Sequence, residues 1–250
     1  MRLGVLWFFV ALAAVTAGRW PTAILWGLVA VLAGRELVTL WWTGAADGRV
    51  SGSEPVVPPA GVVAVVAVLI FVVPAAAAVG TGLAGAALLL VVVALVAFSV
   101  AGRAGAAGLT SAQAGAIAIA VLVPAIPAAA IVLVVGAHLW AGLFLVLAVS
   151  LYDAGFFIGG AESGSLVEGP VTGIIGVLAV TFTMAMFQAP PFDTASAAIV
   201  GGLCAVACPV GQWTASAVLP TADSPARALR RLDTYIVAAP VFLGAAWMLA

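Results

Sequence analysis

Long apolar runs, separated by short polar or glycine- and proline-rich segments, make up most of this chain. The runs are continuous and do not alternate with polar residues, which excludes a bilayer-spanning β-barrel. Most have close to the ~20 residues that an α-helix needs to cross a ~30 Å hydrocarbon core. The pattern predicts an all-α integral membrane protein, with about nine transmembrane helices in one bundle over residues 1–250. The expected spans are 3–18, 20–43, 61–79, 83–101, 114–135, 137–160, 171–189, 195–219 and 233–250.

The composition narrows the class of protein further. Hydrophobic residues make up 66% of the chain and charged residues 7%, against about 45–50% and 25% in soluble domains. These values exclude a soluble globular domain, a disordered chain and a nucleic-acid binder, which needs a basic face. Cys204 and Cys208 form no disulfide framework. They lie one helical turn apart and are expected to be small residues at a helix contact, although a metal pair is conceivable.

The first apolar run has a second interpretation. Arg2, the apolar residues after it and Ala14–Ala17 resemble a secretory signal peptide. The next apolar run begins within two residues, which leaves little room for the start of a soluble mature protein. We therefore expect the run to be a membrane span, with the signal peptide as the alternative.

The arginines predict an orientation, because positively charged connections stay on the cytoplasmic side. With nine spans, the N-terminus shares one side with every even-numbered connection, whereas Arg19 lies on the other side and Arg35 within a span. The expected location is the inner or plasma membrane of the cell, with a cytoplasmic N-terminus and an external C-terminus. The arginines on the predicted cytoplasmic side are Arg2, Arg49, Arg103, Arg227, Arg230 and Arg231.

Ionisable residues within the expected spans are candidate sites, since a charge at the centre of a bilayer costs at least ~2.5–3.5 kcal/mol. Asp153 needs a cation, a metal or a proton there. Glu36 is expected to face the bundle, either as a structural contact or as part of a site. Asp233 begins the last span beside Arg230 and Arg231, where a simple interfacial ion pair is an equal alternative. His138, near Trp140, is expected to lie at the membrane interface.

Several short motifs occur in the order and at the depth of a known signature. Gly211 and Ser216 are followed by Arg231 and Asp233, and further upstream Asp153 precedes Phe156-Phe157 and Gly160. The whole set resembles the phosphatidate cytidylyltransferase (CDP-diacylglycerol synthase) family over most of the chain. The matching segments are 36–37, 153–160, 167–173, 211–216, 230–234 and 238–242.

The resemblance implies an activity in phospholipid metabolism. The family joins phosphatidate to CTP, forms CDP-diacylglycerol and releases pyrophosphate, with Mg²⁺ as cofactor. The implied catalytic residues are Asp153, Ser216 and Asp233, and the implied metal ligands are Asp233, Ser216 and Asp223. The implied phosphate-binding residues are Glu168, Arg227, Arg230 and Arg231.

The departures from the family pattern bear on catalysis. Gln212 stands where the family has its first metal-binding Asp, Leu219 replaces a Lys, and Arg230 replaces a second Asp. Each lost electrostatic group typically costs ~10²–10³ in rate. We therefore expect the fold to persist with impaired or lost catalysis, as in a pseudoenzyme. If the site is active, the protein uses CTP and Mg²⁺; otherwise it needs no cofactor.

Two alternatives remain open at this point. The chain could be a non-catalytic subunit that binds a phosphatidate-like lipid head group or a partner membrane protein, with a homodimer as one form. A small transporter is the third hypothesis. Against a transporter, the sequence has no paired broken helices with ionisable residues in two corresponding halves.

Overall fold

The computed structural model describes residues 2–42, 57–103, 111–160, 167–220 and 224–249. These residues form nine α-helices and one short 3-10 helix, η1, and eight helical segments are long and apolar enough to cross a membrane. The chain is a polytopic helical membrane protein, as the apolar pattern predicts. The elements are α1 (Arg2–Thr16), α2 (Arg19–Trp42), α3 (Ala60–Val79), α4 (Thr81–Arg103), α5 (Ser111–Ala137), α6 (Leu139–Gly160), α7 (Glu168–Phe187), α8 (Thr194–Val218), η1 (Leu229–Arg231) and α9 (Tyr235–Leu249).

Helix α1 differs from the other predicted spans in its length. Its 15 residues extend about 22 Å at 1.5 Å per residue, less than the ~30 Å of a hydrocarbon core. It packs against α2 and α6. Val15 is buried there, and the Trp7 ring meets Trp26 edge to face. The expected first span is therefore a helix of the bundle, but it is shorter than a full crossing.

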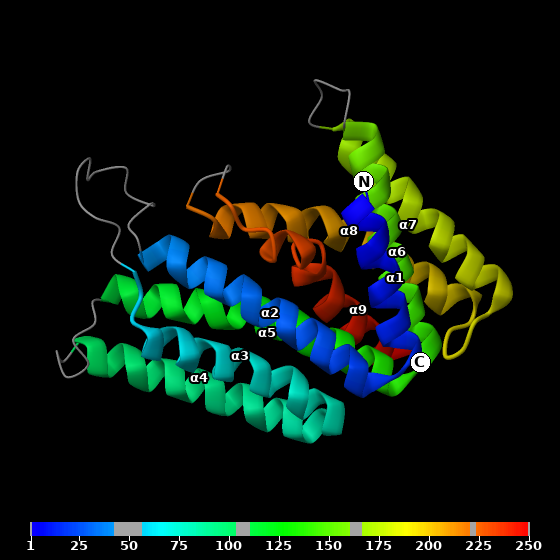
Figure 1. Cartoon of the computed structure of the whole chain (residues 1–250). Helices are drawn as coiled ribbons and strands as arrows, with labels where there is room; N and C mark the ends of the chain where they lie inside the picture. The colour runs from blue at the N-terminus through cyan, green and yellow to red at the C-terminus, as the bar shows by residue number, and fades with distance from the viewer. Residues whose placement is uncertain (1, 43–56, 104–110, 161–166, 221–223, 250) are drawn as a thin grey trace.

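The helices form two groups that meet at α9. Helices α2 and α5 lie side by side, with the α3–α4 hairpin on one side and α9 on the other (Figure 1). Helices α6 and α7 form a second pair, which runs at an angle to the first group (Figure 1). Helix α8 packs on both α7 and α9. This arrangement brings α6, α8 and the start of α9 together.

Glycines set the close approach of α6 and α7. A Cβ added to Gly155 would lie 2.5 Å from the carbonyl oxygen of Thr172, and one added to Gly173 would lie 2.7 Å from the Tyr152 ring. The Thr172 hydroxyl donates a hydrogen bond to the Gly155 carbonyl at 2.8 Å. Small residues allow such contacts between membrane helices. This contact fixes the rotation of α6 and therefore the direction in which Asp153 projects.

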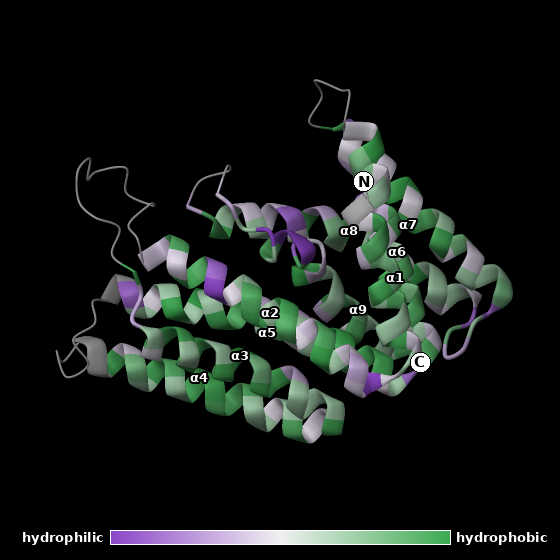
Figure 2. Ribbon diagram, in the orientation of Figure 1, coloured by the Kyte–Doolittle hydropathy of each residue, from purple (hydrophilic) through white to green (hydrophobic). Residues whose placement is uncertain are grey.

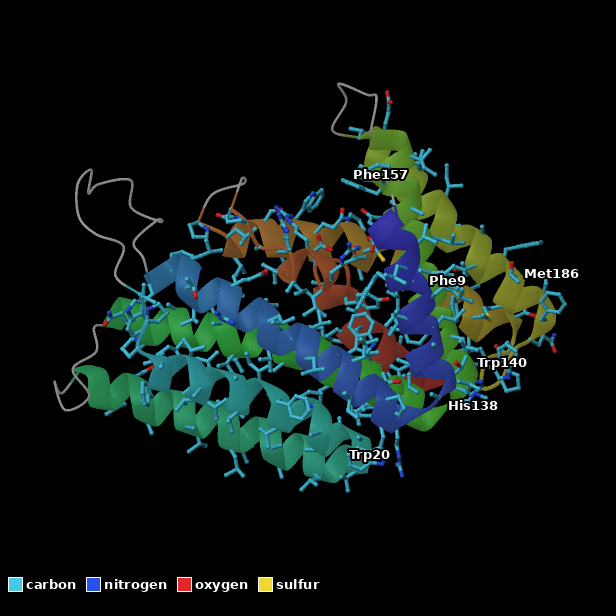
Figure 3. All side chains as sticks on the ribbon, viewed as in Figure 1. Phe9, Trp20, His138, Trp140, Phe157 and Met186 are labelled. Atoms are coloured by element: carbon cyan, nitrogen blue, oxygen red, sulfur yellow. The ribbon has the colours of Figure 1, made fainter. Side chains whose placement is uncertain are left out.

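Polar and apolar side chains occupy different parts of the surface. Hydrophilic residues gather at the segment with η1 and near the end of α2, whereas the bodies of α3, α4 and α5 are apolar (Figure 2). Exposed apolar side chains such as Phe157 and Met186 point outward (Figure 3). His138 and Trp140 lie at the turn from α5 to α6 (Figure 3), where His138 Nδ1 accepts from the Trp140 N–H at 3.3 Å. This places His138 at a helix end, beside Trp140.

Candidate functional site

The Thr234 hydroxyl joins the two acids that the sequence singles out most strongly. It donates to Asp153 Oδ1 at 2.6 Å and lies 3.3 Å from Asp233 Oδ1. The Thr234 backbone N–H also donates to Asp233 Oδ1, at 2.7 Å. Asp153 and Asp233, 80 residues apart in sequence, therefore lie on opposite sides of one hydroxyl. Asp153 is exposed, while Asp233 is buried.

Gly211 brings α8 close to these acids. A Cβ added to Gly211 would lie 2.6 Å from the carbonyl oxygen of Asp233 and 2.7 Å from that of Thr234. The backbone of residues 233–234 therefore lies directly against α8, where only hydrogen fits. Helical geometry then places Gln212 and Ser216 one turn apart on α8, next to the start of α9.

Arg230 contacts both α8 and the segment that precedes α9. Its Nη1 donates to Ser216 Oγ at 3.4 Å and lies 3.9 Å from Asp233 Oδ2. The segment from residue 229 to residue 234 is η1 followed by turns, so the last α-helix begins at Tyr235 and not at Asp233. The two side chains nevertheless meet, because a 3-10 turn also places residues three apart on one face.

Tyr152 completes the contacts between α6 and α8. Its hydroxyl donates to Gln212 Oε1 at 3.2 Å. The Gln212 side-chain amide thus accepts a hydrogen bond from a phenol. We use the name "polar cluster" for Asp153, Gln212, Ser216, Arg230, Asp233 and Thr234.

The described residues do not fit a Mg²⁺ site. Within them, no group of three or more His, Cys, Asp or Glu side chains could hold a metal ion. Mg²⁺ requires octahedral oxygen coordination, usually with carboxylates, and the Arg230 guanidinium already lies beside Asp233. Asp223, one of the three expected ligands, lies outside the described residues.

The other expected phosphate-binding residues lie at different distances from the polar cluster. Arg231 is within electrostatic range of both Asp153 and Asp233. Arg227 is exposed and faces α2 across a groove. Glu168 is exposed as the first residue of α7, and no described contact joins its side chain to the cluster. Of these three residues, only Arg231 lies near the two acids.

Among the described residues, the hydrogen bonds of the Glu36 carboxylate all come from the protein backbone. Its carboxylate accepts from the Ala228 N–H at 2.9 Å and from the Leu229 N–H at 3.1 Å. These donors precede and begin η1, so Glu36 fastens the segment between α8 and α9 to α2. The contact supports the structural interpretation of Glu36.

Sequence reasoning missed the two uncharged residues that connect the site. Thr234 bridges the acids, and Tyr152 binds Gln212. A signal for both exists, because each is a hydroxyl-bearing residue directly next to one of the acids in the sequence.

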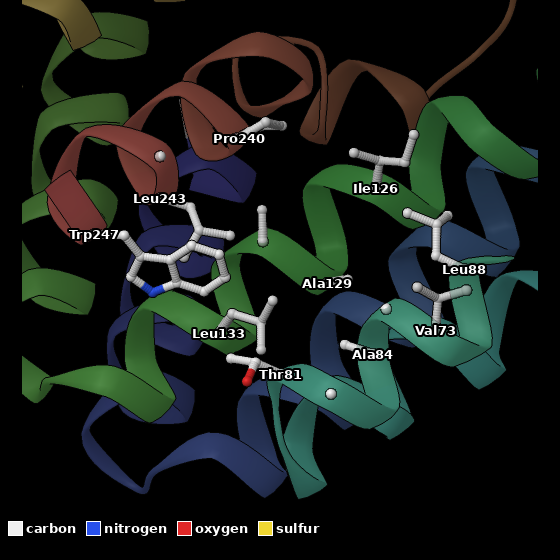
Figure 4. A pocket seen from close by; sticks show the side chains of 14 residues that line it. Val73, Thr81, Ala84, Leu88, Ile126, Ala129, Leu133, Pro240, Leu243 and Trp247 are labelled. Atoms are coloured by element: carbon white, nitrogen blue, oxygen red, sulfur yellow. The ribbon is translucent and has the colours of Figure 1, made fainter.

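A separate cavity of about 880 Å³ lies between α3, α4, α5 and α9. Among its labelled side chains, only Thr81 and Trp247 carry polar atoms (Figure 4). It contains no residue of the polar cluster and no charged side chain. The lining of this cavity is therefore apolar, unlike the polar cluster.

Comparison with known proteins gives no family assignment. No model of a known protein family matches this chain, and no curated protein matches it.

Proposed function

We propose that this membrane protein is a divergent relative of the phosphatidate cytidylyltransferases that binds a phosphate-bearing lipid head group and has impaired or lost cytidylyl transfer. One observation carries the proposal: Arg230 contacts Asp233 and Ser216 at once. By resemblance, Asp233 and Ser216 are the positions of a metal ligand and a catalytic residue. A guanidinium between them takes the electrostatic place of a divalent ion.

The charges of the cluster favour binding over transfer. Arg230 pairs with Asp233, whereas Arg231 lies near Asp153 and Asp233 without a close ion pair among the described residues, and a guanidinium fork of this kind recognises phosphate. Phosphoryl and nucleotidyl transfer depend on cations that neutralise charge on the transferring group. An arginine paired with a carboxylate supplies less of that neutralisation than a free metal ion does.

Cytidylyl transfer is tested with the full chain purified in neutral detergent. We expect no CDP-lipid above the protein-free background when phosphatidate, CTP and Mg²⁺ are supplied. Formation of CDP-diacylglycerol by the unmodified protein, and its loss in Asp233→Asn, would show an active enzyme and overturn the proposal.

We propose the inner or plasma membrane as the location, with the N-terminus in the cytoplasm and the C-terminus outside. The support is the arginine distribution, six on one predicted side against Arg19 on the other. Reporters fused at both ends test this orientation. A C-terminal reporter found in the cytoplasm contradicts the proposed orientation. An external N-terminal reporter together with an external C-terminal one shows that the 15-residue α1 does not cross.

A further inference from the structure

A groove between α2 and the segment around η1 contains three arginines. Its volume is about 630 Å³. One wall is the face of α2 with Val29, Leu32 and Arg35, and the other is the connection with Pro225, Arg227 and Arg231. We call it the α2–η1 groove.

The groove carries net positive charge. Within the part of the chain that the structure describes, none of its three arginines forms a salt bridge, since the one ion pair found there joins Arg230 to Asp233. Glu36 also lines the groove, but its oxygens accept the two backbone N–H groups of residues 228–229. The arginines therefore present donors that a ligand can use.

The α2 side of the groove continues a stripe that faces lipid. Ile24, Leu28 and Leu32 lie on one face of α2, and each is about half exposed (53%, 53% and 52%). Arg35 follows on the same face, one turn beyond Leu32, and is exposed. A guanidinium at the end of an apolar stripe is stable where lipid head groups begin. An occupant can thus have an acyl chain along the stripe and an anion at the arginines.

The groove also leads to the polar cluster. Arg231 lines the groove and is within electrostatic range of Asp153 and Asp233. We propose that the α2–η1 groove admits an anionic phospholipid sideways from the bilayer, with its phosphate on Arg35, Arg227 and Arg231 and an acyl chain along Val29 and Leu32. This inference rests on the proposed lipid-phosphate function and adds Arg35, which the family resemblance does not include.

The test measures lipid binding by the full chain in neutral detergent. Apparent affinity comes from the rise in unfolding temperature with added dioleoyl phosphatidate. Dioleoyl phosphatidylcholine and inorganic phosphate are the comparison ligands. We expect phosphatidate alone to stabilise the protein, because the site needs both the phosphomonoester and the chain. Equal stabilisation by inorganic phosphate would overturn the lipid assignment in favour of a soluble anion.

Arginine variants locate the site. Arg35→Gln should weaken phosphatidate binding roughly five-fold, and Arg35→Gln with Arg227→Gln roughly twenty-five-fold, at about 1 kcal/mol per arginine. Arg19→Gln is the matched control, since it removes an arginine from the opposite end of the same helix. Unchanged binding in the Arg35 and Arg227 variants would overturn the proposal.

Two further variants separate this proposal from the function on which it rests. Leu32→Trp should fill the groove and weaken binding, whereas Leu89→Trp, at an exposed position on α4 outside the groove, should not. Arg230→Gln alters the polar cluster alone. If Arg230→Gln abolishes phosphatidate binding while the groove variants bind normally, the proposed function stands and the groove is not the site. If phosphatidate binds to none of the proteins, both proposals fail.

Discussion

Glu36 and the Asp153–Asp233 pair are acids of the helical bundle, and the protein accommodates them in different ways. Glu36 accepts two backbone N–H groups from a single neighbouring segment. Asp153 and Asp233 share the Thr234 hydroxyl, and Asp233 also lies 3.9 Å from the exposed guanidinium of Arg230. A carboxylate held by backbone donors is part of the structure. A carboxylate paired with an exposed guanidinium, as Asp233 is, can exchange that partner for a ligand.

The largest effect is expected from breaking the Glu36 contact. Glu36→Ala leaves the Ala228 and Leu229 N–H groups without an acceptor, which should lower the free energy of unfolding by about 2–4 kcal/mol. Thermal unfolding in detergent, followed by tryptophan fluorescence, measures the change. Glu36→Gln is the matched control, because it keeps one acceptor oxygen and should lose about half as much. Equal stability in all three proteins would contradict the structural role.

A methyl group at Gly211 should disturb the Asp153–Asp233 pair. Gly211→Ala places a Cβ 2.6 Å from the Asp233 carbonyl oxygen, and overpacking of this kind costs about 1–3 kcal/mol. Gly202→Ala on the same helix meets nothing within 4 Å and should leave stability unchanged. The same unfolding measurement compares the two variants, and similar losses would show that the close approach at residue 233 is unimportant.

Adding carboxylates to the polar cluster sharpens the comparison through metal binding. Arg230→Asp combined with Gln212→Asp removes a cation and adds two acids near Asp233, so Mg²⁺ affinity should rise about ten-fold or more. Calorimetric titration measures it. Arg19→Asp is the control. It makes the same charge change as Arg230→Asp, but at the start of α2, and should leave Mg²⁺ affinity unchanged. Tight Mg²⁺ binding by the unmodified protein, with no gain in the double variant, would favour an active enzyme.

The smallest effect concerns a fourth acid, Asp193, which lies at the start of α8 and outside the spans. Asp193 accepts from the Ser196 N–H at 2.7 Å and from its hydroxyl at 2.6 Å. These hydrogen bonds hold the pKa of Asp193 below its usual range. A lowered pKa adds stability above the ordinary Asp range, and this contribution disappears as the pH falls through the lowered value. Asp193→Asn should keep the helix cap and remove this acid dependence, as seen in unfolding temperatures between about pH 2 and pH 6.

The helices could be predicted from the sequence because hydrophobic length is a local property. The contact between Arg230 and Asp233 was also predictable from spacing. The partner of Glu36 was not, since it lies 192 residues away and is a backbone N–H that every residue except proline carries. The Thr234 bridge depends on the rotation of α6, which the packing at Gly155 and Gly173 sets. The pattern of polar and apolar positions does not show which glycines form such a helix contact.

The two cysteines of the folded protein are expected to react poorly with thiol reagents. Cys204 and Cys208 are the only thiols in the 250 residues. Both are fully buried in α8, with their sulfur atoms 3.9 Å apart. A bulky maleimide reagent therefore reaches them only when α8 separates from its neighbours. The rate of thiol labelling then measures how fast the bundle opens. A cysteine introduced at the surface would react alone, which makes the unmodified chain a ready background for mapping which residues face water.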